Sequence, residues 1–203
     1  MNRVFLFDVY GIILGRTDYE SIYDYLKPEV SLDEFIYLLR DSDYAKKVEL
    51  GLISMNDFIE WFLNSVHSDL SVENMICAYK KAKVNYYSDT VDLIHLLKSK
   101  GYKVGILSNL RTLSLDHLKS VVDLNDIDYQ FYSCYMHNAK PNKSIYESVI
   151  KTIDLNRHHI YFFDDTKENC DKASECGLIG IHTTGKNIKA DFDKLLEKEG
   201  MIL

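Results

Sequence analysis

Short apolar segments that end abruptly in polar residues constrain the fold of this chain more than any other feature of its sequence. One of these segments, FYSCY at 131–135, leads toward Lys140 and Pro141. Continuous apolar strands that alternate with helical segments are typical of a parallel sheet covered on both faces. We therefore expect an α/β core with a doubly wound, Rossmann-like parallel sheet. The other four segments are VFLF before Asp8, VGIL before Ser108-Asn109, IYFF before Asp164-Asp165 and LIGI before His182.

Helices are expected between these strands from about residue 86 onward. Ser88 and Asp89 precede apolar residues at helical spacing, and lysines followed by Gly101 close the segment. A polar start, basic last turn and glycine stop are typical of a helix. Three further helices are expected, at about 167–176 before Gly177, at Lys143-Ser144 with IYESVIKTI, and at IKADFDKLLEKEG.

The alternation of strands and helices fails between about residues 15 and 85. Three segments there have apolar residues at helical spacing. Each begins at a serine followed three positions later by an acidic residue or asparagine, a pattern typical of helix N-termini. Because this region directly follows the first strand, the sequence predicts a helical cap over 15–85 inserted into a core formed by 1–14 and 86–203. The three segments are SLDEFIYLLR, SMNDFIEWFLNSV and SVENMICAYKKA.

Composition and charge exclude several classes of protein. The 203 residues include 24 Lys and Arg against 31 Asp and Glu, a formal charge of -7, so a basic nucleic-acid-binding surface is not expected. The apolar segments are far shorter than the ~20 residues that cross a membrane, and no signal peptide is evident. The four cysteines form no C-x-x-C pair, which favours a reducing compartment. We expect a cytoplasmic monomer or weak homodimer without nucleic-acid or membrane partners.

Polar side chains that directly follow the predicted strands form the candidate site. In an open parallel sheet, ligands bind outside the carboxyl ends of the strands, so residues far apart in sequence meet there. Carboxylate oxygens together with substrate phosphate are typical ligands of Mg²⁺, and a lysine can balance charge during phosphoryl transfer. The sequence thus predicts a magnesium and phosphate site at Asp8, Ser108, Asn109, Lys140, Asp164 and Asp165.

The ordered set FDVYG, ILSN, KP before a helix, and FFDDTKEN resembles the four motifs of the haloacid dehalogenase superfamily of hydrolases. The resemblance spans essentially the whole chain. More narrowly, ELGLISMNDF with SNL and FFDDTKEN is similar to bacterial sugar-phosphate phosphatases that have a small helical cap. The resemblance implies a Mg²⁺-dependent phosphatase of a small phosphorylated metabolite, a sugar phosphate among the candidates.

The resemblance also implies a role for each acidic position. Asp8 matches the nucleophile that forms an aspartyl-phosphate intermediate, which divides one difficult hydrolysis into two easier steps. The carboxylate of Asp8, the backbone carbonyl of Tyr10 and the carboxylate of Asp164 match the magnesium ligands. Asp165 and Glu168 are expected nearby, as ligands or as partners of ligands.

Three other positions match the residues that hold the phosphate. Ser108 and Asn109 match the pair that binds phosphoryl oxygens, and Lys140 matches the lysine that pairs with the nucleophile and with those oxygens. Pro141 is expected to stiffen the loop that carries Lys140.

The sequence departs from the phosphatase pattern at Tyr10, where these enzymes usually have a second aspartate as general acid and base. A tyrosine there resembles the hydrolytic dehalogenases, in which halide leaves without a proton. The hydrolytic dehalogenases are metal-independent enzymes, whereas this chain retains the acidic pair Asp164 and Asp165. The dehalogenases also usually have threonine at the position of Ile12. The carboxylates favour the phosphatase. A hydrolytic 2-haloacid dehalogenase and a non-catalytic binding protein with a degenerate site stay open as alternatives.

Overall fold

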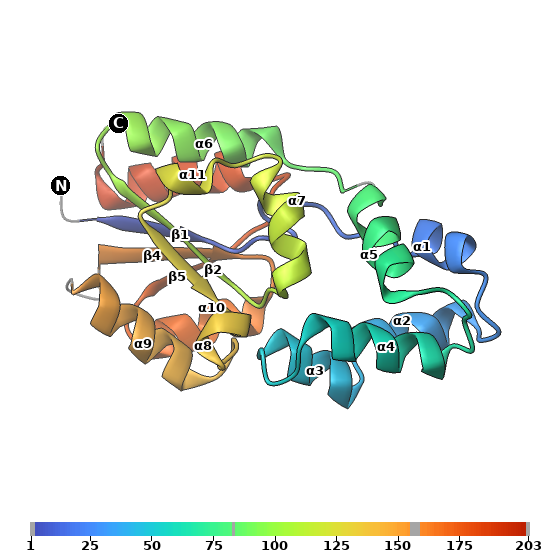
Figure 1. Ribbon diagram of the computed structural model, residues 1–203. Helices are drawn as coiled ribbons and strands as arrows, with labels where there is room; N and C mark the ends of the chain where they lie inside the picture. The colour runs from blue at the N-terminus through green and yellow to red at the C-terminus, as the bar shows by residue number, and fades with distance from the viewer. Residues whose placement is uncertain (1–2, 83, 155–158, 202–203) are drawn as a thin grey trace.

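The computed structural model describes residues 3–82, 84–154 and 159–201, and Figure 1 shows an α/β core beside a group of helices. All strands of the core run parallel, in the order β3-β2-β1-β4-β5. The doubly wound fold predicted from the sequence is thus confirmed. The strands are β1 (Val4–Phe7), β2 (Lys103–Ser108), β3 (Tyr129–Tyr132), β4 (Ile160–Asp164) and β5 (Ile179–His182).

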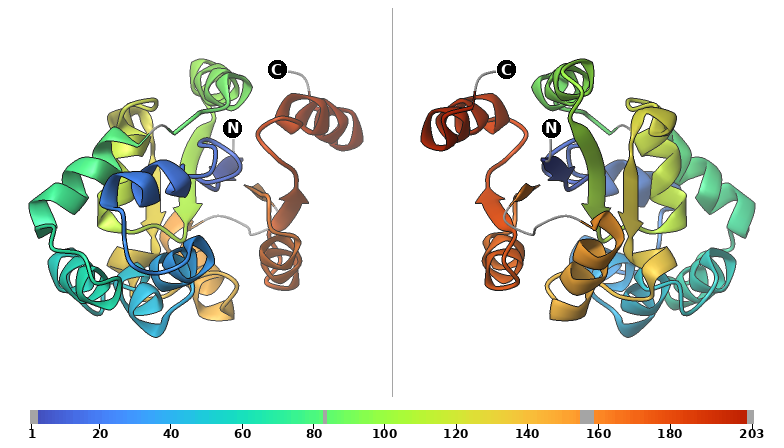
Figure 2. Two further views of the ribbon diagram at one scale, coloured as in Figure 1. Left: turned by 90° about the vertical axis from the view of Figure 1, so that its right-hand side faces the viewer. Right: turned by 90° about the vertical axis from the view of Figure 1, so that its left-hand side faces the viewer.

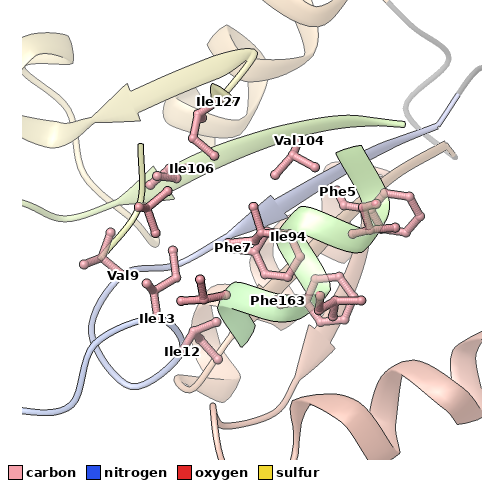
Figure 3. Close-up of a cluster of buried hydrophobic side chains, with 14 of the residues drawn as sticks. Phe5, Phe7, Val9, Ile12, Ile13, Ile94, Val104, Ile106, Ile127 and Phe163 are labelled. Carbon is pink, nitrogen blue, oxygen red and sulfur yellow. The ribbon is translucent and has the colours of Figure 1, made fainter. Parts of the chain in front are cut away.

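Helices cover both faces of the sheet, as the continuous apolar strands predict (Figure 2). On β1, Phe5 and Phe7 pack against the layer of α6, α7 and α11, whereas Val4 and Leu6 pack against α9 and α10. Figure 3 shows the first of these clusters. All four side chains are fully buried, so β1 is the centre of the hydrophobic core. The core helices are α6 (Ser88–Ser99), α7 (Leu115–Lys119), α8 (Ser133–Met136), α9 (Lys143–Ile153), α10 (Lys167–Glu175) and α11 (Ile188–Glu199), with 3₁₀ turns at Thr112–Ser114 and Leu124–Asp126.

The fifth predicted strand, at 131–135, is placed wrongly by the sequence. Pairing of β2 with β3 ends where Ser108 meets Tyr132, and the next four residues form α8. Ser133 is fully buried, and its hydroxyl accepts from Leu110 N at 2.9 Å and donates to Glu49 O at 2.8 Å. Because the ladder has no partner beyond Tyr132, the chain satisfies its polar groups in a helical turn instead.

In the described part of the cap region, five helices share a hydrophobic cluster of their own. Those predicted from the sequence are α2, α4 and α5, and the side chains of Ser31, Ser54 and Ser71 accept from the backbone N–H three residues on, as predicted. Two more helices, α1 and α3, were not predicted, although Asp18 and Ser42 cap them. The bounds are α1 (Tyr19–Leu26), α2 (Leu32–Arg40), α3 (Asp43–Glu49), α4 (Met55–Ser65) and α5 (Val72–Lys81).

Several contacts hold the cap against the core, and two of them involve a glycine. Where the chain enters and leaves the cap, Gly15 N donates to Asn85 O at 2.6 Å. At the other contact, the turn after α3 lies against α8. Gly51 there has φ +65°, and a Cβ would lie 2.1 Å from the carbonyl oxygen of Cys134, so a larger residue would push the two apart. Among the described residues, no helix has the length and apolar character required to span a membrane.

Candidate active site

The ends of three adjacent strands place the predicted site residues together. Asp8 follows β1, Ser108 ends β2 and Asp164 ends β4, and these strands are neighbours in the sheet. Asp8 N donates to Phe163 O at 2.9 Å, which continues the pairing of β1 with β4 by one residue. The nearness of the polar side chains is therefore a direct consequence of parallel pairing at the carboxyl edge.

Lys140 forms the centre of a buried ion cluster. Its Nζ lies 2.9 Å from Asp8 Oδ1 and 2.6 Å from Asp164 Oδ2, and its side chain is 1% exposed. Burial alone would lower the pKa of Lys140, but the two carboxylates outweigh it and raise the pKa. Lys140 is therefore a permanent cation that holds Asp8 in place.

Asn109 holds the backbone of Lys140 from both sides. Asn109 Nδ2 donates to Lys140 O at 2.9 Å, and Lys140 N donates to Asn109 Oδ1 at 2.8 Å. The peptide bond from Lys140 to Pro141 is cis. The amide of Asn109 thus joins the end of β2 to the loop of Lys140, a positioning contact that its spacing in the sequence does not reveal.

Asp164 accepts hydrogen bonds from the start of α10. Thr166 N donates to Asp164 Oδ1 at 2.8 Å, and Asn169 Nδ2 lies 3.1 and 3.0 Å from the two carboxylate oxygens. Sequence reasoning missed Asn169, although it ends the FFDDTKEN motif. Glu168, which was expected at the site, is instead exposed and lies outside the carboxylate cluster, because its position on α10 faces solvent.

Three carboxylates gather where a metal ion is expected. Asp8, Asp164 and Asp165 each offer an oxygen, and these oxygens lie within 4.8 Å of one another. Burial raises the pKa of Asp8 to about 6, in spite of Lys140, and burial together with Asp164 raises the pKa of Asp165. One ammonium group does not balance this excess of negative charge. The oxygen donors and the unbalanced charge fit a divalent cation such as Mg²⁺.

The loop after Asp8 supports the same cluster. Gly11 has φ +84°, and a Cβ there would lie 2.2 Å from Asp165 Oδ2, so only glycine permits this approach. Among the described residues, no backbone N–H donates to the carbonyl oxygen of Tyr10. That oxygen is thus available as a ligand, as the sequence resemblance implies.

An open pocket of about 710 Å³ connects the site to the cap. The core contributes Ser108, Asn109 and Lys140 beside the acidic residues, and α1 and α2 of the cap form the facing wall. No motif or spacing in the sequence marks the cap residues of this wall. They are Arg16, Thr17, Asp18, Tyr19, Glu20, Ile36 and Arg40.

Tyr10 belongs both to the pocket and to the junction with the cap. Its hydroxyl lies 3.2 Å from that of Tyr79 on α5, which lies 3.0 Å from Ser114 Oγ. Burial, with a smaller contribution from Tyr79, raises the pKa of Tyr10, so its phenol stays neutral. A neutral phenol of this kind does not act as a general base at physiological pH.

Comparison with known proteins finds a family model that matches most of this chain. A family model described as haloacid dehalogenase-like hydrolase matches residues 3–177. A sesquiterpene phosphatase from Aspergillus oryzae is 30% identical over 93 residues, which are 45% of this chain and 47% of that protein. The chain therefore spans about half the length of this relative.

Solved structures match over most of both chains. A HAD-like family hydrolase from Porphyromonas gingivalis has a TM-score of 0.79 at 21% identity, over 97% of this chain and 98% of its own. A HAD family enzyme from Bacteroides thetaiotaomicron, in complex with magnesium and inorganic phosphate, has a TM-score of 0.75 at 21% identity, over 88% and 92%. At these identities the structures support the shared fold.

Proposed function

The chain belongs to the haloacid dehalogenase-like hydrolases, and from that premise we propose that it is a Mg²⁺-dependent phosphatase of a small phosphorylated metabolite. The observation that carries this proposal is the buried cluster of Asp8, Asp164 and Asp165 around Lys140, open to a pocket large enough for a metabolite. The phosphatase among its relatives and the magnesium and phosphate complex of a structural neighbour support it. A sugar phosphate is one candidate substrate.

Each residue of the cluster has a role in the proposed reaction. Asp8 attacks phosphorus and forms an aspartyl phosphate, which water then hydrolyses. Lys140 orients Asp8 and balances charge on the phosphoryl oxygens, while Ser108 and Asn109 contribute hydrogen bonds to them. Mg²⁺, held by Asp8, Asp164, Asp165 and the carbonyl of Tyr10, would stabilise negative charge on the phosphoryl group.

A hydrolytic dehalogenase is the second candidate, and Tyr10 is the observation that favours it. Halide leaves without a proton, so that reaction needs no acid at this position. The three clustered carboxylates favour the phosphatase, because they would repel one another in a site that never held a cation. The third candidate is a binding protein that retains the site without turnover.

The expected surroundings of the protein follow from the same observations. A formal charge of -7 disfavours binding to nucleic acid, and the pocket suits a small molecule. No disulfide joins any of the four cysteines, all of which lie in the described part of the chain, and this supports a reducing compartment such as the cytoplasm. We propose a monomer or weak homodimer.

Hydrolysis of phosphorylated sugars and of 4-nitrophenyl phosphate, with Mg²⁺ and with chelator, tests the proposal. We expect turnover that needs Mg²⁺ and that Asp8→Asn abolishes. Asp193→Asn is the matched control, because Asp193 is exposed on α11 and has the same charge. Release of halide without metal would favour the dehalogenase. Binding of Mg²⁺ without any turnover would favour the binding protein.

A further inference from the structure

The hydroxyl of Tyr10 is engaged with the cap rather than free in the pocket. It ends a chain of three hydroxyl groups through Tyr79 to Ser114, with oxygen separations of 3.2 and 3.0 Å. Tyr79 is held in turn, because its ring stacks on His117 at 5.0 Å and the adjacent Lys80 pairs with Asp116 at 2.8 Å. The described residues that line the pocket include Tyr10 but neither Tyr79 nor Ser114.

The pocket offers few other groups that could donate a proton to a leaving group. Lys140 is fixed between Asp8 and Asp164 at 2.9 and 2.6 Å. Both oxygens of Asp18 accept from Ser21, at 3.0 and 2.6 Å, as the N-cap of α1.

Glu20 is the remaining carboxylate of the cap wall, and it is exposed. No histidine is found among the described residues that line this pocket. The cap wall thus offers no imidazole among the described residues, and its two carboxylates are the N-cap of α1 and an exposed side chain rather than a buried acid aimed at Asp8.

From this geometry we propose that the site acts on phosphate compounds whose leaving group departs without a proton, namely acyl, enol or aryl phosphates, in preference to alkyl esters. The proposal rests on the phosphatase function proposed above and narrows its substrate class. The cap wall with Arg16 and Arg40 would then face the leaving part of such a compound.

The chemistry balances without a general acid. In the first step a bond forms from an Asp8 carboxylate oxygen to phosphorus while the bond from phosphorus to the leaving oxygen breaks, and the leaving group departs with the electron pair as an anion. In the second step water attacks phosphorus and the bond to Asp8 breaks. The two protons of water leave with the phosphate, which then loses one to solvent according to its own pKa.

A series of substrates with different leaving groups tests the proposal on the wild-type protein with Mg²⁺. We compare kcat/KM for acetyl phosphate and 4-nitrophenyl phosphate with that for ethyl phosphate and glycerol phosphate. General acid catalysis contributes about 10²–10⁴-fold, so the alkyl esters are expected to be slower by about that factor. Comparable kcat/KM values for aryl and alkyl esters would overturn the proposal.

Three variants show whether a hidden donor exists. Tyr10→Asp places a carboxyl group at the position of the phenol and is expected to lower the ratio of aryl to alkyl kcat/KM by about tenfold or more. Tyr79→Phe, which breaks the hydroxyl chain, and Glu20→Gln are expected to leave that ratio unchanged, whatever they do to the absolute rates. A merely structural role would alter all substrates alike, so the ratio isolates proton donation.

The substrate series and the variants distinguish a failure of the proposed leaving-group preference from a failure of the proposed phosphatase function. A selective loss of alkyl-ester hydrolysis in Tyr79→Phe or Glu20→Gln would identify a proton donor and overturn the present proposal, while the phosphatase function would stand. Absence of Asp8-dependent hydrolysis for every member of the series would overturn the phosphatase function and, with it, this one. Should Tyr10→Asp fail to fold, the series on the wild type still decides the outcome.

Discussion

Replacing Lys140 by methionine is expected to destabilise the metal-free protein strongly. The change removes the one ammonium group that neutralises Asp8 and Asp164, whose oxygens lie 2.9 and 2.6 Å from Nζ. The side chains of Lys140 and Asp164 are 1% and 0% exposed, so water cannot replace the lost partner. Methionine keeps an unbranched stem of similar volume, and the effect therefore comes mainly from charge.

The structure sets the size of this effect and its dependence on pH. Removing one partner of a buried ion pair costs about 3–5 kcal/mol of unfolding free energy. Burial already raises the pKa of Asp8 to about 6 with Lys140 present, and we expect it to rise further without the ammonium group. A native pKa above the unfolded one means that protonation favours the native state. The deficit of the variant should thus be largest at about pH 7 and above, and should shrink as the pH falls toward about 4.

Urea unfolding of the metal-free proteins at several pH values measures this deficit. Lys143→Met is the matched control, because the side chain of Lys143 is 70% exposed and forms a surface ion pair with Glu147 at 3.1 Å. Its expected cost is below about 0.5 kcal/mol. A loss of less than about 1 kcal/mol for Lys140→Met at pH 7, or a deficit that grows on acidification, would refute the reasoning.

Three further changes test other parts of the structure. Gly11→Ala would place a Cβ 2.2 Å from Asp165 Oδ2 and should weaken Mg²⁺ binding in a calorimetric titration. Gly101→Ala is the control, because Gly101 has φ +77° and thus similar backbone strain, but no atom lies within 4 Å of its Cβ. This control should leave the affinity for Mg²⁺ unchanged. Hydrogen bonds from two lysines and a backbone N–H outweigh burial and lower the pKa of Asp128 to about 2. The ionised Asp128 stabilises the folded protein above its unfolded pKa, and this stabilisation is lost as the pH falls toward 2. Asp128→Asn should therefore lower the free energy of unfolding by up to about 2 kcal/mol at neutral pH and leave it unchanged in strong acid. An equal loss at both pH values would contradict this. Ser71→Ala removes the N-cap of α5 and should cost about 1 kcal/mol in thermal unfolding, with faster amide exchange confined to the cap; unchanged exchange in α5 would argue against it.

The core was predictable from sequence because its strands are buried on both faces. A strand such as β1, with every side chain enclosed, must be continuously apolar, and the polar residue that follows marks the edge where Asp8 lies. The strand near 131–135 was misplaced because its boundary depends on where β2 stops pairing, which no local pattern records. Asn169 was missed for a similar reason, since its role depends on α10 turning it toward Asp164.

Tyr10 shows where local sequence stops being informative and why the departure is physically reasonable. Its partner Tyr79 lies 69 residues further along the chain, so only the docked cap reveals that the phenol belongs to a junction. An aspartate at this position would add a fourth carboxylate beside three that have one ammonium group among them. Each like charge raises the cost of ionising the others, whereas a neutral phenol adds none and still bonds to the cap. The same substitution removes a source of protons, so the charge balance that stabilises the site also restricts the leaving groups it can expel.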